Sequence, residues 1–413
     1  MFLELDKTLM EREILSALEK TAQIALGMLP RMIVREGSSA GLFCQKLRGA
    51  APGRLEREGV SARYSIIALI GIGAVFGAEG VQDDAWRASL ERLSQLLDGD
   101  RLTLGELGLL LWLDPYVNGA FAPRVCASLS RRWRAEKAAA DTMECAWILA
   151  GLAKNVSLPA AERSALTKQA LKSVLGAYNP GSQLFCLNGH APRGYWNENR
   201  YQRVLGSFAS QIYPLFALSA SHERHPDPRI LNIVHGVAGR MAALQGAEGQ
   251  WWWIFDVRTG SVFLDYPVYS VHQDAMGPMG LLAASRAAQT GAYLPALSKG
   301  LEYLFRRAGA WTGGGLVDES EGMIWRAVVR DVPGEDPADM PFGLGCEDMG
   351  RVRSAGRPRL FQSRDTGRPR EYRVLKEARP YCAGWILFAY AQACEMFGER
   401  PGLEMPGFLS ACA

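Results

Sequence analysis

The stretch that decides the fold reads Gln245-Gly246-Ala247-Glu248-Gly249-Gln250-Trp251. A glutamine is followed four residues later by a glycine, and two residues after that by a tryptophan. Glycine permits a tight turn after a helix, while tryptophan can bury a large apolar surface beneath the next one. The stretch therefore predicts a junction between two helical hairpins.

The Gly-x-Trp end of this stretch recurs along the chain. It appears as Gly194-Tyr195-Trp196, again at Gly249–Trp251, and as Gly309-Ala310-Trp311, with the tryptophans 55 and 60 residues apart. That distance is about the length of one helical hairpin with its loop. Self-similarity at a nearly fixed period predicts a repeat architecture.

Apolar residues recur at helical spacing between glycine and proline breaks over most of the chain. The pattern predicts helices at about 5–29, 61–77, 84–98, 102–114, 122–136, 141–154, 159–178, 202–221, 228–244, 271–289, 294–308 and 380–398. Twelve helices in sequential hairpins are what six αα units need to close a ring. We therefore predict an all-α (α/α)6 toroid that spans residues 1–413 as one domain.

Two segments interrupt the helices. Residues 253–257 and 261–264 flank Arg258-Thr259-Gly260 and predict a short β-hairpin. Residues 311–379 are rich in glycine, proline and arginine, with a hairpin-like piece around 365–367. A long insertion of this kind in a helical domain is more often functional than idle, so we expect it to fold over one mouth of the ring.

Composition places the chain among ordinary globular proteins. Of its 413 residues 48% are hydrophobic and 22% charged, with a formal net charge of +3. The eight cysteines lack zinc spacing, which predicts buried free thiols in a reducing compartment and no metal site. Acidic residues stand in Met1–Asp6 where a signal peptide needs basic ones, and the apolar run 64–78 is short for a bilayer. We expect a cytoplasmic protein without a transmembrane segment or cofactor.

The spacing of Gln245, Gly249 and Trp251 resembles the QW repeat of the squalene and terpenoid cyclase family. The overall plan is also similar to the wider set of (α/α)6 toroids, which includes six-hairpin glycoside hydrolases, polysaccharide lyases and sugar epimerases. The resemblance implies a ring of helical hairpins with a site in its cavity.

The motifs that carry the chemistry of the cyclases are missing from the sequence. Neither a DxDD nor a DDxxD motif occurs, and the nearest string is Val81-Gln82-Asp83-Asp84 followed by Ala85-Trp86-Arg87. Residues Tyr381–Trp385 do not supply the zinc ligands of a lanthionine cyclase. The resemblance therefore predicts the fold and leaves the reaction open.

The strongest candidate site is the cluster Asp265, Tyr266, Tyr269, His272 and Asp274, directly before a strongly apolar helix. The charged residues would then lie where an inner helix begins, close to the mouth of the ring. Histidine beside carboxylates and tyrosines suits general acid–base catalysis, because its pKa can be adjusted around neutrality. The alternative is that Asp274 caps the helix and His272 binds a neighbouring loop.

Two acidic sets are further catalytic candidates. Asp318, Glu319 and Glu321 fall in the loop region, as do Glu347 and Asp348. Paired carboxylates across a pocket are the usual equipment for glycoside hydrolysis, and Asp318 and Glu321 could supply it. The alternative for both sets is a solvated acidic loop.

A set of amide, arginine and aromatic residues suits sugar recognition, because rings stack on pyranose faces and polar groups bind hydroxyls or carboxylates. The alternative is that the asparagines cap a helix and that Gln211 is surface-exposed. The candidate substrate-binding residues are Trp196, Asn197, Arg200, Gln211, Tyr213, Trp251, Trp325 and Arg326.

Residues 351–379 hold ten basic and three acidic residues, a net charge of +7. Such a patch can attract an anionic glycan or a diphosphate, or it can be a solvated loop. It contains no recognisable nucleic-acid-reading module, so we expect no nucleic-acid partner.

Three functions remain open. The first is a glycan-processing hydrolase, lyase or epimerase that uses His/Asp/Tyr chemistry on a small-molecule or oligosaccharide substrate, anionic ones included. In this scheme His272 and Tyr269 exchange protons, and Asp274 orients His272. The second is a terpenoid-cyclase-like enzyme in which Asp265 or Asp274 protonates an isoprenoid and aromatic rings stabilise the cation. The third is a non-catalytic toroid that binds a partner. The sequence leaves the oligomeric state open.

Overall fold

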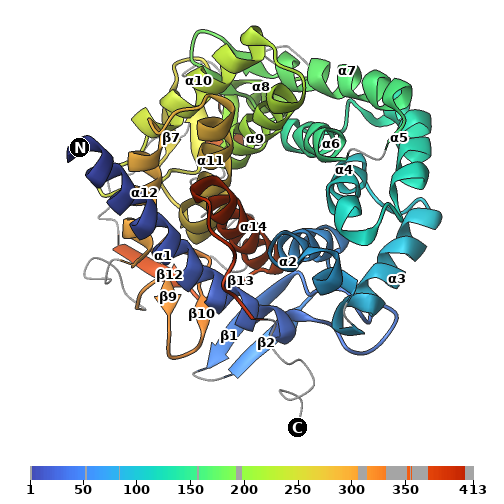
Figure 1. Cartoon of the computed structure of the whole chain (residues 1–413), viewed down its shortest axis with the longest axis horizontal. Helices are drawn as coiled ribbons and strands as arrows, with labels where there is room; N and C mark the ends of the chain where they lie inside the picture. The colour runs from blue at the N-terminus through green and yellow to red at the C-terminus, as the bar shows by residue number, and fades with distance from the viewer. Residues whose placement is uncertain are drawn as a thin grey trace.

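The chain forms a ring of helices in two layers (Figure 1). The computed structural model describes residues 2–51, 54–82, 84–155, 158–191, 198–305, 314–331, 351–353, 355 and 371–404. The inner helices are α2 (Ala62–Gln82), α4 (Leu104–Leu113), α6 (Thr142–Lys154), α9 (Phe208–Arg224), α11 (Gly277–Ala287) and α14 (Pro380–Phe397). The outer helices are α1 (Phe2–Met32), α3 (Asp84–Asp98), α5 (Ala122–Glu136), α7 (Ala160–Gly176), α10 (Pro228–Ala243) and α12 (Leu294–Phe305). Six hairpins of one outer and one inner helix confirm the predicted (α/α)6 toroid.

The predicted helices agree with the observed ones except in one place. The helix predicted at 202–221 is divided into α8 (Tyr201–Val204), strand β5 (Leu205–Ser207) and α9. The prediction was wrong there because β5 pairs with β6 (Ile254–Asp256), a partner far away in the sequence. Apolar residues on that buried strand continue the helical spacing.

The connections at the two ends of the ring differ in length. In the described part of the chain, every named strand precedes the N-terminus of an inner helix, while the connections at the other end are short turns. The strands are β1 (Lys46–Ala51), β2 (Arg54–Glu58), β3 (Tyr178–Asn179), β4 (Leu184–Phe185), β5, β6, β7 (Ser261–Leu264), β8 (Val268–Tyr269), β9 (Val317–Asp318), β10 (Met323–Ile324), β11 (Ala327–Asp331), β12 (Glu371–Leu375) and β13 (Glu377–Ala378). One mouth of the ring is thus framed by small sheets.

The predicted hairpin at 253–264 is confirmed as β6 and β7, which pair antiparallel. Parts of the predicted insertion 311–379 are also strands: β11 lies between β8 and β12, and β13 pairs with β1. The hairpin-like piece at 365–367 and most of the basic stretch 351–379 lie outside the described residues.

The Gln245–Trp251 stretch is a packing junction. The Gln245 side-chain amide donates hydrogen bonds to the carbonyl oxygens of Gly249 (2.7 Å) and Ala296 (2.8 Å). Gly249 has a φ of +102°, which glycine adopts without strain. The Trp251 ring is 1% exposed and fits between Gly277 and Gly300. The other two Gly-x-Trp sites, at Trp196 and Trp311, lie outside the described residues.

The inner helices pack closely. An added Cβ at Gly151 of α6 would lie 2.3 Å from the carbonyl oxygen of Gly108 on α4, so these two backbones touch. Helix α2 is long and apolar enough over Ala62–Val81 to cross a membrane, but most of that segment is buried within the ring. The six cysteines in the described residues are buried thiols outside any disulfide, as predicted.

Replacing Gly151 with alanine should therefore lower the free energy of unfolding by about 2 kcal/mol or more, because the added methyl group forces α4 and α6 apart. Gly239→Ala is the matched control. Gly239 lies on the outer helix α10 with no atom within 4 Å of an added Cβ. Gly239→Ala should raise the free energy of unfolding by up to about 1 kcal/mol, because alanine has a higher helix propensity than glycine. Urea unfolding measures both, and equal effects of the two substitutions would contradict the close-packed ring.

Candidate functional site

A cavity of about 190 Å³ lies at the mouth framed by the sheets. Its described lining comes from five helical segments and from the strands and loops beside them. The lining residues are Arg63, Tyr64, Ile67, Met143, Trp147, Ala209, Tyr213, Trp253, Tyr269, Val271, His272, Met276, Arg326, Arg379 and Tyr381.

The cavity lies where the inner helices begin. Arg63, Met143, Ala209 and Tyr381 each fall in the first turn of α2, α6, α9 and α14. The fifth segment is a π-helical turn, His272–Met276, directly before α11. Helix N-termini carry partial positive charge and free N–H groups, so their convergence favours an anion.

Two buried arginines share one carboxylate beside the cavity. Arg326 Nη1 lies 2.8 Å from Glu377 Oε1, and Arg379 Nε lies 2.6 Å from the same oxygen. The Glu377 side chain is fully buried, and Oε2 has no hydrogen-bond partner among the described residues. One negative charge therefore compensates two positive ones, and the group keeps an excess positive charge.

The third arginine, Arg63, lies in the first turn of α2. Its Nη2 is 3.0 Å from Glu144 Oε1, and its guanidinium lies 5.0 Å above the Trp147 ring. Glu144 does not line the cavity. Among the described lining residues there are three arginines and no aspartate or glutamate.

Four tyrosines complete the polar lining. Arg379 Nη1 donates a hydrogen bond to the Tyr64 hydroxyl oxygen (3.0 Å), and the Tyr64 and Tyr381 rings are 4.7 Å apart. Burial raises the pKa of Tyr213, Tyr269 and Tyr381, so these three phenols keep their protons at neutral pH.

His272 lines the cavity but stays neutral. Burial lowers its pKa to about 3, and its ring stacks on Phe208 at 4.2 Å between centroids. A pKa near neutrality, as the sequence led us to expect, does not occur here. The neutral ring shapes the cavity wall and is a poor proton shuttle at pH 7.

Asp274 lies in the same π-helical turn but not in the cavity lining. It is completely buried, and neither carboxyl oxygen has a hydrogen-bond partner among the described residues. Burial raises its pKa well above the usual value. The expectation that Asp274 orients His272 therefore does not hold in this structure, because His272 Nδ1 also has no hydrogen-bond partner among the described residues.

The other members of this sequence cluster divide between cavity and surface. Tyr269 lines the cavity, with the Arg326 guanidinium 5.1 Å above its ring. Tyr266 stacks on Tyr372 away from the lining, and burial raises its pKa to about 12. Asp265 forms an ion pair with Arg330 at 2.8 Å.

The acidic set lies outside the cavity. The Asp318 carboxylate accepts hydrogen bonds from Ser320 Oγ, the Glu321 backbone and Trp325 Nε1, and so fixes the turn between β9 and β10. The carbonyl oxygen of Glu321 accepts from Arg31, which ties this turn to α1. Glu347 and Asp348 lie outside the described residues.

Of the candidate substrate-binding residues, Tyr213 and Arg326 line the cavity. Gln211 was expected at a pocket or on the surface, but it is fully buried and bonds the backbone N–H and carbonyl of Phe185. Trp251 is buried between Gly277 and Gly300 and does not line the cavity. Trp325 is buried under Lys376, and Arg200 is buried away from the cavity. Trp196 and Asn197 lie outside the described residues.

Sequence reasoning missed the arginines and tyrosines at the starts of two inner helices. Arg63 and Tyr64 precede the apolar run of α2, and Arg379 and Tyr381 flank the first residue of α14. The signal that selected His272, polar residues at the start of an apolar inner helix, was present at both places. Within the described residues, no group of three or more His, Cys, Asp or Glu is arranged to hold a metal ion.

Asp274→Asn should stabilise the protein increasingly as the pH rises above the usual pKa of an aspartate. Wild-type Asp274 keeps its proton to a higher pH in the folded state than in the unfolded chain, so the free energy of unfolding falls as the pH rises. One proton corresponds to a slope of up to about 1.4 kcal/mol per pH unit. Urea unfolding at several pH values measures the difference. The exposed, ion-paired Asp98→Asn is the control and should shift stability by less than about 1 kcal/mol. A pH-independent difference for Asp274→Asn would contradict the neutral buried acid.

Comparison with known proteins finds likeness only in structure. No family model matches the sequence, and no curated protein matches it. An unsaturated glucuronyl hydrolase specific for heparin superposes with a TM-score of 0.59 at 11% identity, over 95% of this chain and 100% of that one. A sugar epimerase from a ruminal bacterium gives 0.57 at 10% identity, over 91% and 98%. An unsaturated glucuronyl hydrolase from Streptococcus agalactiae gives 0.52 at 10% identity, over 92% and 91%. At these identities the likeness establishes the toroid fold.

Proposed function

We propose that the protein is a glycan-processing enzyme that binds an anionic sugar in the central cavity and moves a proton on the carbon next to its carboxylate. Such a reaction ends as a β-elimination or an epimerisation. The observation that carries the proposal is the Arg326–Glu377–Arg379 group, whose excess positive charge lies beside four tyrosines. The similar structures, glucuronyl hydrolases and a sugar epimerase, support a sugar as the substrate class.

The charge and shape of the cavity favour a sugar acid. Planar guanidinium groups bind carboxylates in a fixed geometry, and five helical segments begin around the cavity. Trp147, Trp253 and the tyrosine rings offer flat apolar faces for a pyranose. A neutral sugar would leave the excess positive charge without a counterion.

The residues suit proton transfer next to a carboxylate. Arg326 and Arg379 would stabilise the negative charge that develops on the carboxylate when the neighbouring carbon loses its proton. In this scheme the phenolate form of Tyr64 is the base, and the Arg379 guanidinium that donates to its oxygen stabilises the negative charge there. The electron pair then either expels the oxygen substituent on the next carbon, which Tyr213 or Tyr269 protonates, or takes a proton back on the opposite face.

The alternatives have less support. Hydrolysis through paired carboxylates needs two acids beside the bond that breaks, and the described lining contains none. A terpenoid-cyclase-like reaction would need Asp265 or Asp274 as the proton donor. Asp265 is ion-paired outside the cavity, and Asp274 does not line it. An arginine-rich wall is also a poor environment for a carbocation.

The test is solvent deuterium exchange, because both elimination and epimerisation pass through loss of the carbon-bound proton. In D2O with glucuronate-containing oligosaccharides, wild-type protein should incorporate deuterium next to the carboxylate, or form the unsaturated product, as seen by NMR. Tyr64→Phe should lower this rate by about 10²–10⁴-fold. Tyr116→Phe, at the opposite end of the ring, is the control and should leave the rate unchanged. New reducing ends without deuterium would instead indicate hydrolysis and defeat the proposal.

A further inference from the structure

A second hollow opens on the same mouth of the ring. This groove, of about 350 Å³, lies between the turn 99–103 before α4 and the turn 137–141 before α6. The buried side chains of Leu102, Leu104 and Ala140 give it an apolar floor, and charged side chains surround it. Because both turns precede inner helices, the groove opens beside the central cavity.

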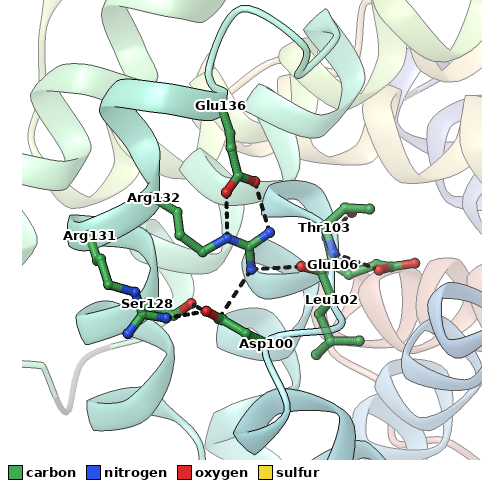
Figure 2. Close-up of polar contacts among 8 residues, drawn as sticks. All are labelled: Asp100, Leu102, Thr103, Glu106, Ser128, Arg131, Arg132 and Glu136. Carbon is green, nitrogen blue, oxygen red and sulfur yellow. Dashed lines mark hydrogen bonds and ion pairs between the residues drawn. The ribbon is translucent and has the colours of Figure 1, made fainter.

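The charged rim of the groove is held rigidly. Figure 2 shows Arg132 between Glu136, which it binds through two nitrogens at 2.7 and 2.8 Å, and the carbonyl oxygen of Leu102 at 2.8 Å. Asp100 accepts from Ser128 Oγ at 3.0 Å and Arg131 Nη2 at 2.5 Å. Hydrogen bonds hold both carboxylates in place, and their remaining lone pairs can accept hydroxyl protons.

One ion pair separates the groove from the cavity. Arg63 lines the cavity, Glu144 lines the groove, and their side chains meet at 3.0 Å. Thr103, also on the groove wall, lies 3.3 Å from the same Glu144 oxygen. The cavity and the groove are therefore neighbours on either side of this ion pair.

The two hollows differ in size and charge. The cavity, at about 190 Å³, is below the range of roughly 300–1,000 Å³ that holds a drug-sized ligand, so it has room for about one sugar ring. The groove is nearly twice as large. Three carboxylates and two guanidinium groups line it, whereas only guanidinium groups are charged in the cavity lining. An anionic ring suits the cavity, and an uncharged ring suits the groove.

We infer that the groove is a second sugar-binding subsite, which holds the uncharged residue next to the anionic sugar in a chain that alternates the two. This inference rests on the proposed function, since it places the anionic sugar in the cavity. Hydroxyl groups of the uncharged ring bind Asp100, Glu136 and Thr103. A second uronate in the groove would face these carboxylates and bind poorly.

The experiment fills the groove and leaves the cavity intact. Ala139 is exposed and lines the groove, so Ala139→Trp would occupy it. Ala138→Trp is the matched control, because Ala138 is an exposed alanine of the same turn that does not line the groove. The probes are glucuronate, a tetrasaccharide that alternates glucuronate with N-acetylglucosamine, and tetragalacturonate, each titrated by calorimetry.

The alternating tetrasaccharide should bind wild type and Ala138→Trp about tenfold tighter than glucuronate does. Ala139→Trp should lose that gain while binding glucuronate unchanged, which also shows that it folds. Tetragalacturonate should gain nothing over a single uronate. If Ala139→Trp keeps the gain, or wild type shows none although it binds glucuronate, the subsite is refuted. If glucuronate does not bind wild type, the proposed function itself fails.

Discussion

The site depends on the two ion pairs that the buried carboxylate of Glu377 makes. Glu377 joins Arg326, just before β11, to Arg379, just before α14, and it lies on β13, which pairs with β1 near the start of the chain. A fully buried charge is costly unless it is paired, so the two arginines are needed there for stability. The two arginines carry two positive charges and Glu377 carries one negative charge. The arrangement that stabilises the mouth therefore also leaves it with a net positive charge.

The ring supplies the rest of the site through its topology. Inner helices all begin at the same mouth, so the first-turn residues of segments far apart in the sequence meet around one cavity. The close glycine contact between α4 and α6 holds neighbouring helices near each other, and the small sheets bring Tyr269 and Arg326 over the opening. The positive ends of the helices and the arginines act in the same direction, toward an anion.

Periodicity predicted the ring almost completely, since burial of inner and outer helices leaves a strong apolar pattern in the sequence. The strand at Leu205–Ser207 could not be predicted, because its partner β6 is distant. For the site, the start of an apolar inner helix was the right place to look. A search for polar residues at the start of one inner helix selected His272 and Tyr269. The same search at α2 and α14 would have selected Tyr64 and Arg379. Which polar residues line the cavity depends on packing. Asp274, two residues from His272, is buried outside the lining, and Gln211 bonds the backbone of β4.

We propose that the cavity recognises a carboxylate through Arg326 and Arg379. Calorimetric titration of methyl glucuronide against methyl glucoside tests it most directly, because the two sugars differ only in that carboxylate. Wild type should prefer the glucuronide by about tenfold or more at low salt, and Arg379→Met should lose the preference. Equal affinity of wild type for the two sugars, or an undiminished preference in both Arg326→Met and Arg379→Met, would contradict the account.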